Sequence, residues 1–322
     1  THLITDHYHY FEDGGATYHG RYNTWEFVRG QEWDPWNSII NIPPETIAKY
    51  HHVQNSGSKR LQGIKNREAI LNEKERPIAK CFEAAVNFID LNRNADSWFL
   101  QLECFDPHEP FSVPERFRDL YPTSYDGPTL DWPLYQRVSE TPEEVAEIQA
   151  NYSALVTMCD WYLGSLLDYI ESHEDLNDVA IVVTTDHGFM LGEHDWWAKS
   201  RMPFYNEVCH IPLLLYLPKS PVADKRRIKS LTQTIDLMPT FLELYDCEIP
   251  ATVEGKSLIQ LIENDLPIRS SALYGRFGAA TNVTDGRYTY FRYPENIDNQ
   301  DLWEYTLMPT HPHSRFDREE FV

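Results

Sequence analysis

The sequence predicts an α/β fold, in which helices flank a mainly parallel central sheet to form a doubly wound sandwich. Two observations predict it: helical patterns alternate with short apolar strands, and one of these strands is a continuous β-branched run of the kind buried on both faces of a parallel sheet. A third observation is that the sequence pattern changes past residue 266 to short strand-like segments around a turn, which predicts a small antiparallel subdomain. We therefore expect two parts, 1–265 and 266–322.

The first elements are a strand, a helix and a second strand. Residues 1–6 are typical of a strand in the middle of a protein, so we expect the fold to lack a preceding N-terminal piece. Residues 76–91 form a helical pattern, and residues 98–105 an apolar strand. A long, Pro-rich loop is expected over 106–133.

The strongest helix signal covers 141–172. It begins with Thr141, Pro142 and Glu144, which form a capping box with proline at the first helical position, and it keeps a helical apolar stripe. The β-branched run over 179–185 (VAIVVTT) follows directly, and we expect a strand of the parallel sheet there.

The last elements are a strand over 211–217, a helix over 236–245 and a hairpin. The hairpin is expected around the turn Asp285-Gly286, because this dipeptide favours tight hairpin turns and is flanked by strand-like residues up to Arg292. The hairpin indicates the antiparallel subdomain.

The chain is strongly acidic: 28 Lys and Arg residues oppose 50 Asp and Glu residues, giving a net charge of −22. Such a field disfavours nucleic-acid phosphates, and no basic stripe overrides it, so we expect no nucleic-acid partner. No run of about 18 apolar residues occurs, so we expect no membrane-spanning segment. An anionic substrate would need a metal or a local cationic cluster.

The cysteines are five in number, widely scattered, and contain no CxxC pair. This usage is typical of reduced core cysteines in a cytosolic protein, and no targeting signal is visible. We therefore expect a cytoplasmic location.

Polar side chains follow three of the predicted strands. In an open parallel sheet, ligands bind beyond the carboxyl ends of the strands, so we expect these side chains to converge. Carboxylate and imidazole together suit a divalent metal, and Lys199 could add a positive charge, so metal-assisted hydrolysis of an anionic ester is the simplest chemistry. The side chains are Asp6, His7, His9, Asp106, His108, Asp186 and His187.

Two other interpretations stay open at this point. The pair His7-x-His9 also suits an amidohydrolase-type barrel, although the strands are too few for eight repeats. A non-catalytic binding protein is the second alternative. Four tryptophans either line a substrate mouth or pack in the core: Trp33, Trp36, Trp196 and Trp197.

The segment 184–194 (TTDHGFMLGEH), followed by Trp197-Ala198-Lys199, closely resembles a signature block of the sulfatase family in the alkaline-phosphatase superfamily. The segment 105–111 (FDPHEPF) resembles the family's D-P-H-x-P-F element, and 6–9 (DHYH) lies where many sulfatases have G-K-W-H. The resemblance covers essentially the whole chain and implies an alkaline-phosphatase-like sandwich.

The resemblance also implies roles for single residues. Asp186 and His187 resemble two ligands of one divalent metal, with calcium or manganese expected first and magnesium or zinc as alternatives. Lys199 resembles the lysine that binds the sulfate oxygens and the leaving oxygen. His108 resembles the histidine that protonates the leaving alcohol.

Two more histidines complete the implied catalytic set. His9 resembles the histidine that hydrogen-bonds the nucleophile and helps release sulfate. His7 stands where the family commonly has lysine, so we expect it to contact the anion as a substrate-binding residue.

The family's nucleophile is a formylglycine made in a C/S-x-P-x-R motif, and none of the five cysteines is followed by x-P-x-R. We therefore expect the formylglycine in a segment before Thr1, and no activity from this chain alone. The expected reaction is hydrolysis of sulfate esters of small molecules or carbohydrates. A phosphonate monoester or phosphodiester hydrolase of the same superfamily, and a pseudoenzyme, remain alternatives, and a homo-oligomer is possible.

Overall fold

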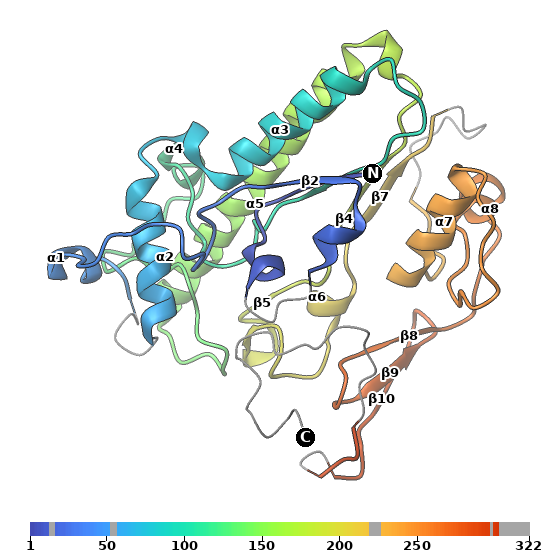
Figure 1. The fold of residues 1–322 in the computed structure, drawn as a ribbon. Coiled ribbons are helices and arrows are strands. Elements are labelled where there is room, and N and C mark those ends of the chain that lie inside the picture. The colour runs from blue at the N-terminus through green and yellow to red at the C-terminus, as the bar shows by residue number, and fades with distance from the viewer. Residues whose placement is uncertain (13–16, 52–56, 219–226, 297–298, 303–322) are drawn as a thin grey trace, which may run out of the picture. The chain divides into compact units, whose positions relative to one another are not determined.

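The computed structural model describes residues 1–12, 17–51, 57–218, 227–296 and 299–302 (Figure 1). Its described residues form two compact units. The first contains the described residues of 1–177 and 190–200, and the second contains those of 178–189 and 201–302. The boundary expected near residue 265 falls inside the second unit and stays a prediction, and residues 303–322 of the expected subdomain lie outside the described part.

The first unit is built on a parallel three-stranded sheet in the order β2-β1-β3. Strand β1 (His2–Thr5) lies in the middle, paired with β2 (Thr24–Phe27) and β3 (Leu100–Glu103). Strands β1 and β3 confirm two of the predicted strands. Strand β2 was not predicted, because its residues TWEF are mostly exposed and form no apolar run.

Two long helices support this sheet. Helix α3 (Pro77–Asn92) packs on β1 and β3, and its buried Cys81 and Ala85 join Ile4 in the core. Helix α5 (Pro142–Glu171) packs along α3 (Figure 1). It begins with the predicted capping box, in which Thr141 and Glu144 bond each other's backbone N–H groups. Both helix predictions are confirmed.

The remaining elements of the first unit are short, apart from α2 (Gly57–Ala69). Strands β5 (Met190–Leu191) and β6 (Trp197–Ala198) pair antiparallel. The others are α1 (Pro44–Ile47), α4 (Glu115–Arg118), and the 3-10 turns η1 (Tyr8–Phe11), η2 (Tyr18–Arg21), η4 (Glu73–Glu75), η5 (Glu174–Leu176) and η6 (Glu193–Asp195).

The second unit corrects one expectation. Strand β4 (Ile181–Thr184) was expected in the parallel sheet, but it pairs antiparallel with β7 (Leu213–Tyr216) in a separate two-stranded sheet. Leu214 and Tyr216 of β7 are exposed. A β-branched run predicts a strand because such side chains suit an extended backbone, but it does not determine the direction of the partner strand.

The rest of the second unit contains the predicted helix and the predicted hairpin, together with further elements. It contains α6 (Asn206–Cys209), η7 (Thr234–Asp236), α7 (Leu237–Leu244) and α8 (Ile259–Asn264). An antiparallel sheet of β8 (Ala272–Gly275), β9 (Thr281–Thr284) and β10 (Thr289–Arg292) follows. The predicted hairpin is β9 and β10, with Gly286 at φ +85° in the turn.

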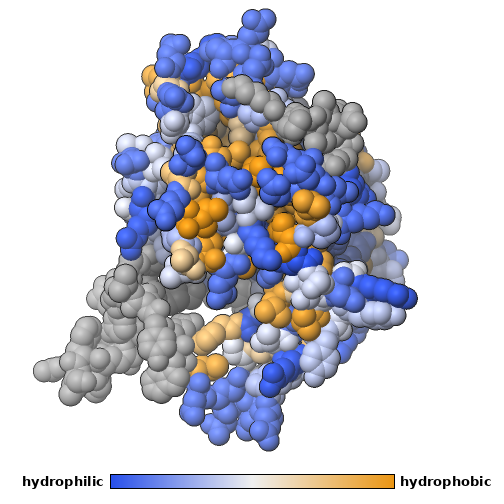
Figure 2. All heavy atoms as spheres, turned by 90° about the vertical axis from the view of Figure 1, so that its right-hand side faces the viewer, coloured by the Kyte–Doolittle hydropathy of each residue, from blue (hydrophilic) through white to orange (hydrophobic). Residues whose placement is uncertain are grey.

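The surface mixes hydrophobic and hydrophilic side chains, and Figure 2 shows several separate hydrophobic patches on one face. Exposed large side chains of the second unit include Leu214, Met238 and Leu273. Among the described residues, no helix combines the length and apolar composition needed to cross a membrane.

Candidate active site

Three of the predicted histidines gather around one aromatic ring in the first unit. The ring of Phe105, just after β3, lies 4.1 Å from the ring of His108, 5.3 Å from that of His7 and 6.2 Å from that of His9, centre to centre. This is possible because β1 and β3 are parallel neighbours, so the residues after them meet at one edge of the sheet.

His9 is held between two carboxylates. Its Nε2 lies 3.1 Å from Oε2 of Glu32, and its Nδ1 lies 3.0 Å from Oε2 of Glu12. Burial lowers the pKa of His9, but the hydrogen bonds and negative charges of Glu32 and Glu12 outweigh burial and raise that pKa above its ordinary value. The imidazolium form of His9 is therefore favoured.

Glu32 is the carboxylate that the sequence analysis missed. Its side chain is 1% exposed, and burial raises its pKa to about 7, although His9 opposes the rise. The charges of Glu109 and Lys199 also act on this pKa, upward and downward respectively, so these groups share one electrostatic environment. A carboxylate and an imidazole that both bind protons near neutral pH form a candidate acid–base pair.

The backbone at Glu32 is constrained. Glu32 has φ +46°, a left-handed conformation that is uncommon for a residue other than glycine. Its carbonyl accepts a hydrogen bond of 3.1 Å from Nδ2 of the buried Asn66, and a Cβ on Gly63 would lie 3.1 Å from the same carbonyl oxygen. Helix α2, which carries Asn66 and Gly63, thus fixes the position of Glu32.

Glu109 connects His108 to Lys199. Its fully buried carboxylate lies 3.3 Å from Nδ1 of His108 and 3.7 Å from Nζ of Lys199, and it accepts a hydrogen bond from the Tyr135 hydroxyl. His108 also donates from Nδ1 to the Glu109 carbonyl oxygen at 2.7 Å. This arrangement fixes the His108 ring with Nδ1 as a donor, so proton exchange with a substrate would use Nε2.

Lys199 is positioned by the hairpin of β5 and β6. Trp197 is fully buried in this hairpin, and its indole N–H donates to Glu140 at 2.7 Å. Ala198 has φ +74°, which turns the chain immediately before Lys199. The Lys199 side chain is 14% exposed, so it is largely held in the protein rather than extended into solvent.

His7 forms a further ion pair at the same edge. Its Nδ1 lies 3.2 Å from Oε1 of Glu103, the last residue of β3, and Tyr10 donates its hydroxyl proton to the same carboxylate. The His7 backbone N–H donates to Thr5 Oγ1 at 3.0 Å. The ring of His7 lies 5.0 Å from the ring of His9, so the two histidines are in direct contact.

Of the two aspartates after β1 and β3, Asp6 is buried and Asp106 is partly buried. Asp6 accepts a hydrogen bond of 2.7 Å from the Phe105 backbone N–H, and Asp106 accepts one of 2.8 Å from the Gln31 side chain. Burial raises the pKa of both carboxyl groups, to about 6 for Asp106. The Asp6 contact joins the ends of β1 and β3, and the Asp106 contact joins the end of β3 to the loop after β2, so both aspartates hold these loops together.

The predicted metal ligands lie in the second unit, directly after β4. Asp186 Oδ2 and His187 Nε2 are 3.3 Å apart, and the side chains are 82% and 38% exposed. His187 donates from Nδ1 to the Gly188 carbonyl oxygen at 2.9 Å, which leaves the Nε2 lone pair beside the carboxylate. A carboxylate oxygen and an imidazole nitrogen that converge in this way fit a divalent cation.

Two ligands do not complete a metal site. Among the described residues, no group of three or more His, Cys, Asp and Glu side chains could hold a metal ion. Gly188 explains the tight turn: its N–H donates to the Val208 carbonyl oxygen at 2.8 Å, and a Cβ there would lie 1.9 Å from the Glu207 carbonyl oxygen. Only glycine fits at this position without a shift of the backbone.

The structure thus brings together His7, His9, His108 and Lys199, with roles that remain predictions, and it holds Asp186 and His187 in the other unit. Glu12, Glu32 and Glu109 are the functional candidates that the sequence analysis missed. Glu109 stands within the quoted F-D-P-H-E-P-F element, so its place beside His108 was the available signal. Glu32 gave no such signal, because 23 positions separate it from its partner His9.

Comparison with known protein families shows to which family the chain belongs. The model of the Sulfatase family matches residues 37–247, which is more than half of the chain. The chain belongs to the sulfatase family. A second model, for the C-terminal region of N-sulphoglucosamine sulphohydrolase, matches residues 192–321 of the chain.

Curated relatives agree with this placement. An N-acetylglucosamine-6-O-sulfatase of Bacteroides thetaiotaomicron is 36% identical over 115 residues, which cover 36% of this chain and 20% of that protein. A sulfatase of Formosa agariphila is 27% identical over 243 residues, covering 66% of this chain and 46% of that protein. The chain therefore spans less than half of each of these relatives.

Solved structures confirm the α/β fold. A phosphonate monoester hydrolase from Silicibacter pomeroyi superposes with a TM-score of 0.55 at 23% identity, covering 68% of this chain and 52% of that chain. A structure in complex with its substrate D-glucosamine-2-N,6-O-disulfate gives a TM-score of 0.54 at 20% identity, covering 76% and 66% respectively. At such identities the likeness concerns the fold.

Proposed function

We propose that this chain belongs to a sulfatase that hydrolyses sulfate esters of carbohydrates. Its side chains would bind the sulfate anion and protonate the leaving oxygen. The observation that carries the proposal is the cluster of His7, His9, His108 and Lys199 in the first unit of a sulfatase-family chain. The similarity to an N-acetylglucosamine-6-O-sulfatase supports a sulfated sugar as the substrate class.

Lys199 and His108 carry the two most direct roles. Lys199 would bind the sulfate oxygens, because its ammonium group is held by the buried Glu109 and cannot swing away. As the bond between sulfur and the leaving oxygen breaks, that oxygen would take a proton from Nε2 of His108. The Glu109 carboxylate, 3.3 Å from Nδ1, holds the ring in place for this step.

His9 would contribute positive charge beside the sulfate. Both of its ring nitrogens face carboxylates, so a hydrogen bond from His9 to a nucleophile requires Glu12 or Glu32 to give up its place. His7 adjoins His9 and would contact the anion from the same side.

Asp186 and His187 would hold a divalent metal ion, calcium or manganese before magnesium or zinc. A bound metal would supply positive charge to an anionic ligand. The nucleophile, a formylglycine, would come from a part of the protein outside these 322 residues.

The test is a paired assay of the protein expressed from its complete reading frame. We expect metal-dependent hydrolysis of 4-nitrophenyl sulfate with a higher kcat/KM than that of 4-nitrophenyl phenylphosphonate. A preference for the phosphonate would establish the alternative hydrolase function. Absence of turnover with both esters, in protein that contains metal and formylglycine, would contradict the proposal.

A further inference from the structure

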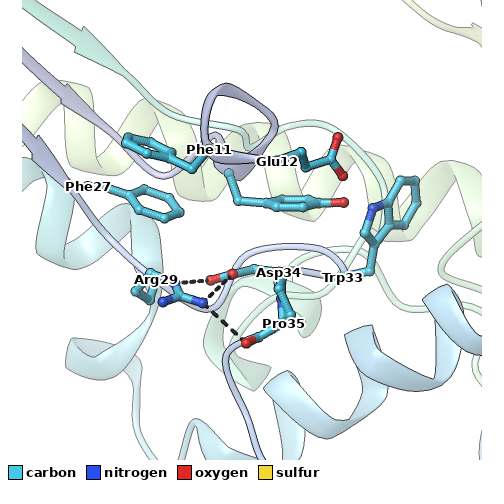
Figure 3. A pocket seen from close by; sticks show the side chains of 8 residues that line it. Phe11, Glu12, Phe27, Arg29, Trp33, Asp34 and Pro35 are labelled. Carbon is cyan, nitrogen blue, oxygen red and sulfur yellow. Dashed lines mark hydrogen bonds and ion pairs between the residues drawn. The ribbon is translucent and has the colours of Figure 1, made fainter. Parts of the chain in front are cut away.

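A pocket of about 560 Å³ lies beside the histidine cluster in the first unit, between the loops that follow β1 and β2 (Figure 3). Four aromatic side chains form much of its lining: Tyr8, Phe11, Phe27 and Trp33. The rings of Phe11 and Phe27 stack 4.1 Å apart, which makes this wall rigid. The volume is in the range of small-molecule sites, and aromatic walls suit the C–H faces of a sugar ring.

The polar groups of the pocket are few and fixed. Arg29 donates from Nε and Nη2 to both carboxylate oxygens of Asp34, at 2.8 and 2.7 Å, and from Nη2 to the Pro35 carbonyl oxygen at 3.3 Å (Figure 3). Nη1 of Arg29 takes part in none of these bonds. The Nη1 donors beside the Asp34 carboxylate match neighbouring sugar hydroxyls, which both donate and accept.

Trp33 provides a donor without a partner. Its ring stacks on Trp132 at 5.5 Å, and Nζ of Lys59 lies 4.9 Å from its centre, so both contacts hold the indole in place. The buried indole N–H has no hydrogen-bond partner among the described residues. A buried donor left unpaired is costly, so this N–H indicates an acceptor supplied by a ligand.

The pocket adjoins the predicted catalytic residue His9. Glu12, which lines the pocket, lies 3.0 Å from Nδ1 of His9, and the Trp33 ring lies 5.6 Å from the His9 ring. A group bound in the pocket would therefore lie next to the sulfate-bearing part of a substrate.

We propose that this pocket binds an uncharged N-acetylamino sugar ring of the glycan that carries the sulfate ester. The acetamide oxygen accepts the Trp33 N–H, the acetamide N–H donates to Glu12, and the sugar ring extends along the aromatic wall toward Phe27. A sulfated or carboxylated ring is disfavoured, because Glu12 and Asp34 contribute two carboxylates to the pocket lining and Arg29, the cation of that lining, is already paired with Asp34. This inference rests on the proposed function for the sulfate ester itself.

The experiment is calorimetric titration of the protein from its complete reading frame with N,N′-diacetylchitobiose, and with cellobiose as the matched sugar without acetamides. We expect chitobiose to bind at least about tenfold more tightly than cellobiose. The variant Trp33→Phe should weaken chitobiose binding about tenfold. Trp36→Phe, a neighbouring tryptophan outside the pocket lining, should leave binding unchanged. If Trp33→Phe fails to fold, as judged by circular dichroism, Phe27→Leu replaces it.

Failure of the two proposals can be told apart. Equal binding of both sugars, no binding of chitobiose, or chitobiose binding that is unaffected by both pocket variants would overturn the sugar site, whatever the turnover of 4-nitrophenyl sulfate. Chitobiose binding that depends on Trp33 would uphold the sugar site even if the same preparation hydrolysed no sulfate ester.

Discussion

The candidate residues of the first unit and those of the second unit differ in how their side chains are held. In the first unit, His108 and Lys199 share a fully buried carboxylate, and His9 lies between two others. In the second unit, Asp186 is 82% exposed and its imidazole partner 38% exposed. The first arrangement is fixed by the protein itself, whereas the second is a pair of open ligands. A pre-organised set of histidine and lysine donors suits the oxygens of an anion, and an open pair of ligands suits a metal ion that brings its own charge.

The largest effect is expected when the Lys199 ammonium group of the first unit is removed. Lys199→Ala should lower kcat for 4-nitrophenyl sulfate by about 10²–10³, because it removes a fixed charge that would stabilise the sulfate oxygens. Lys74→Ala, at an exposed position of the same unit, is the control and should keep full activity. Activity within a factor of two of the unaltered protein would remove Lys199 from the mechanism.

In the second unit, the expected effect is on the affinity for a divalent metal ion. His187→Ala should reduce bound divalent metal by about 10- to 100-fold in affinity, measured by metal analysis after dialysis against a graded chelator. His210→Ala changes an exposed histidine of the same unit and should keep the metal. Equal metal content in the two variants would show that Asp186 and His187 are not a metal site.

Breaking the connection between His108 and Lys199 tests whether the first unit is pre-organised. Glu109→Gln keeps the volume but removes the buried charge, and we expect about a tenfold loss of kcat and about 1–3 kcal/mol of unfolding free energy, measured by urea denaturation. Glu83→Gln, an exposed change on α3, should alter neither quantity. Unchanged kcat with lowered stability would make Glu109 a purely structural residue.

The smallest expected effect is on how folding stability depends on pH, which the carboxylates beside His9 influence. Glu32 binds a proton in the folded protein up to a pKa of about 7, against an ordinary value of 4.5, so folded protein holds more protons than unfolded protein in this window. Stability therefore falls as pH rises from 4.5 to 7, and the raised pKa of His9 acts in the same direction. In Glu32→Gln the melting temperature should fall less over this range. An unchanged slope would contradict the role of Glu32.

Local sequence signals predicted most of the long elements. The capping box at Thr141, the apolar stripe of α5 and the Asp285-Gly286 turn are all short-range features, and the structure confirms the helix and the hairpin they predict. The direction of β4 could not be read in this way, because pairing with β7 depends on residues about 30 positions away. Strand β2 was missed because its exposed residues lack an apolar pattern.

The same division holds for the candidate site. The sequence by itself determined the family and placed histidines after β1 and β3, because the family motifs and the strand ends are continuous in the chain. Only the tertiary structure decided which carboxylates face them: Glu32 reaches His9 from a distant loop, and Glu109 meets Lys199 across 90 positions. The physical reason is that an ion pair depends on distance in space and on burial, and neither quantity is written in the spacing of two residues along a chain.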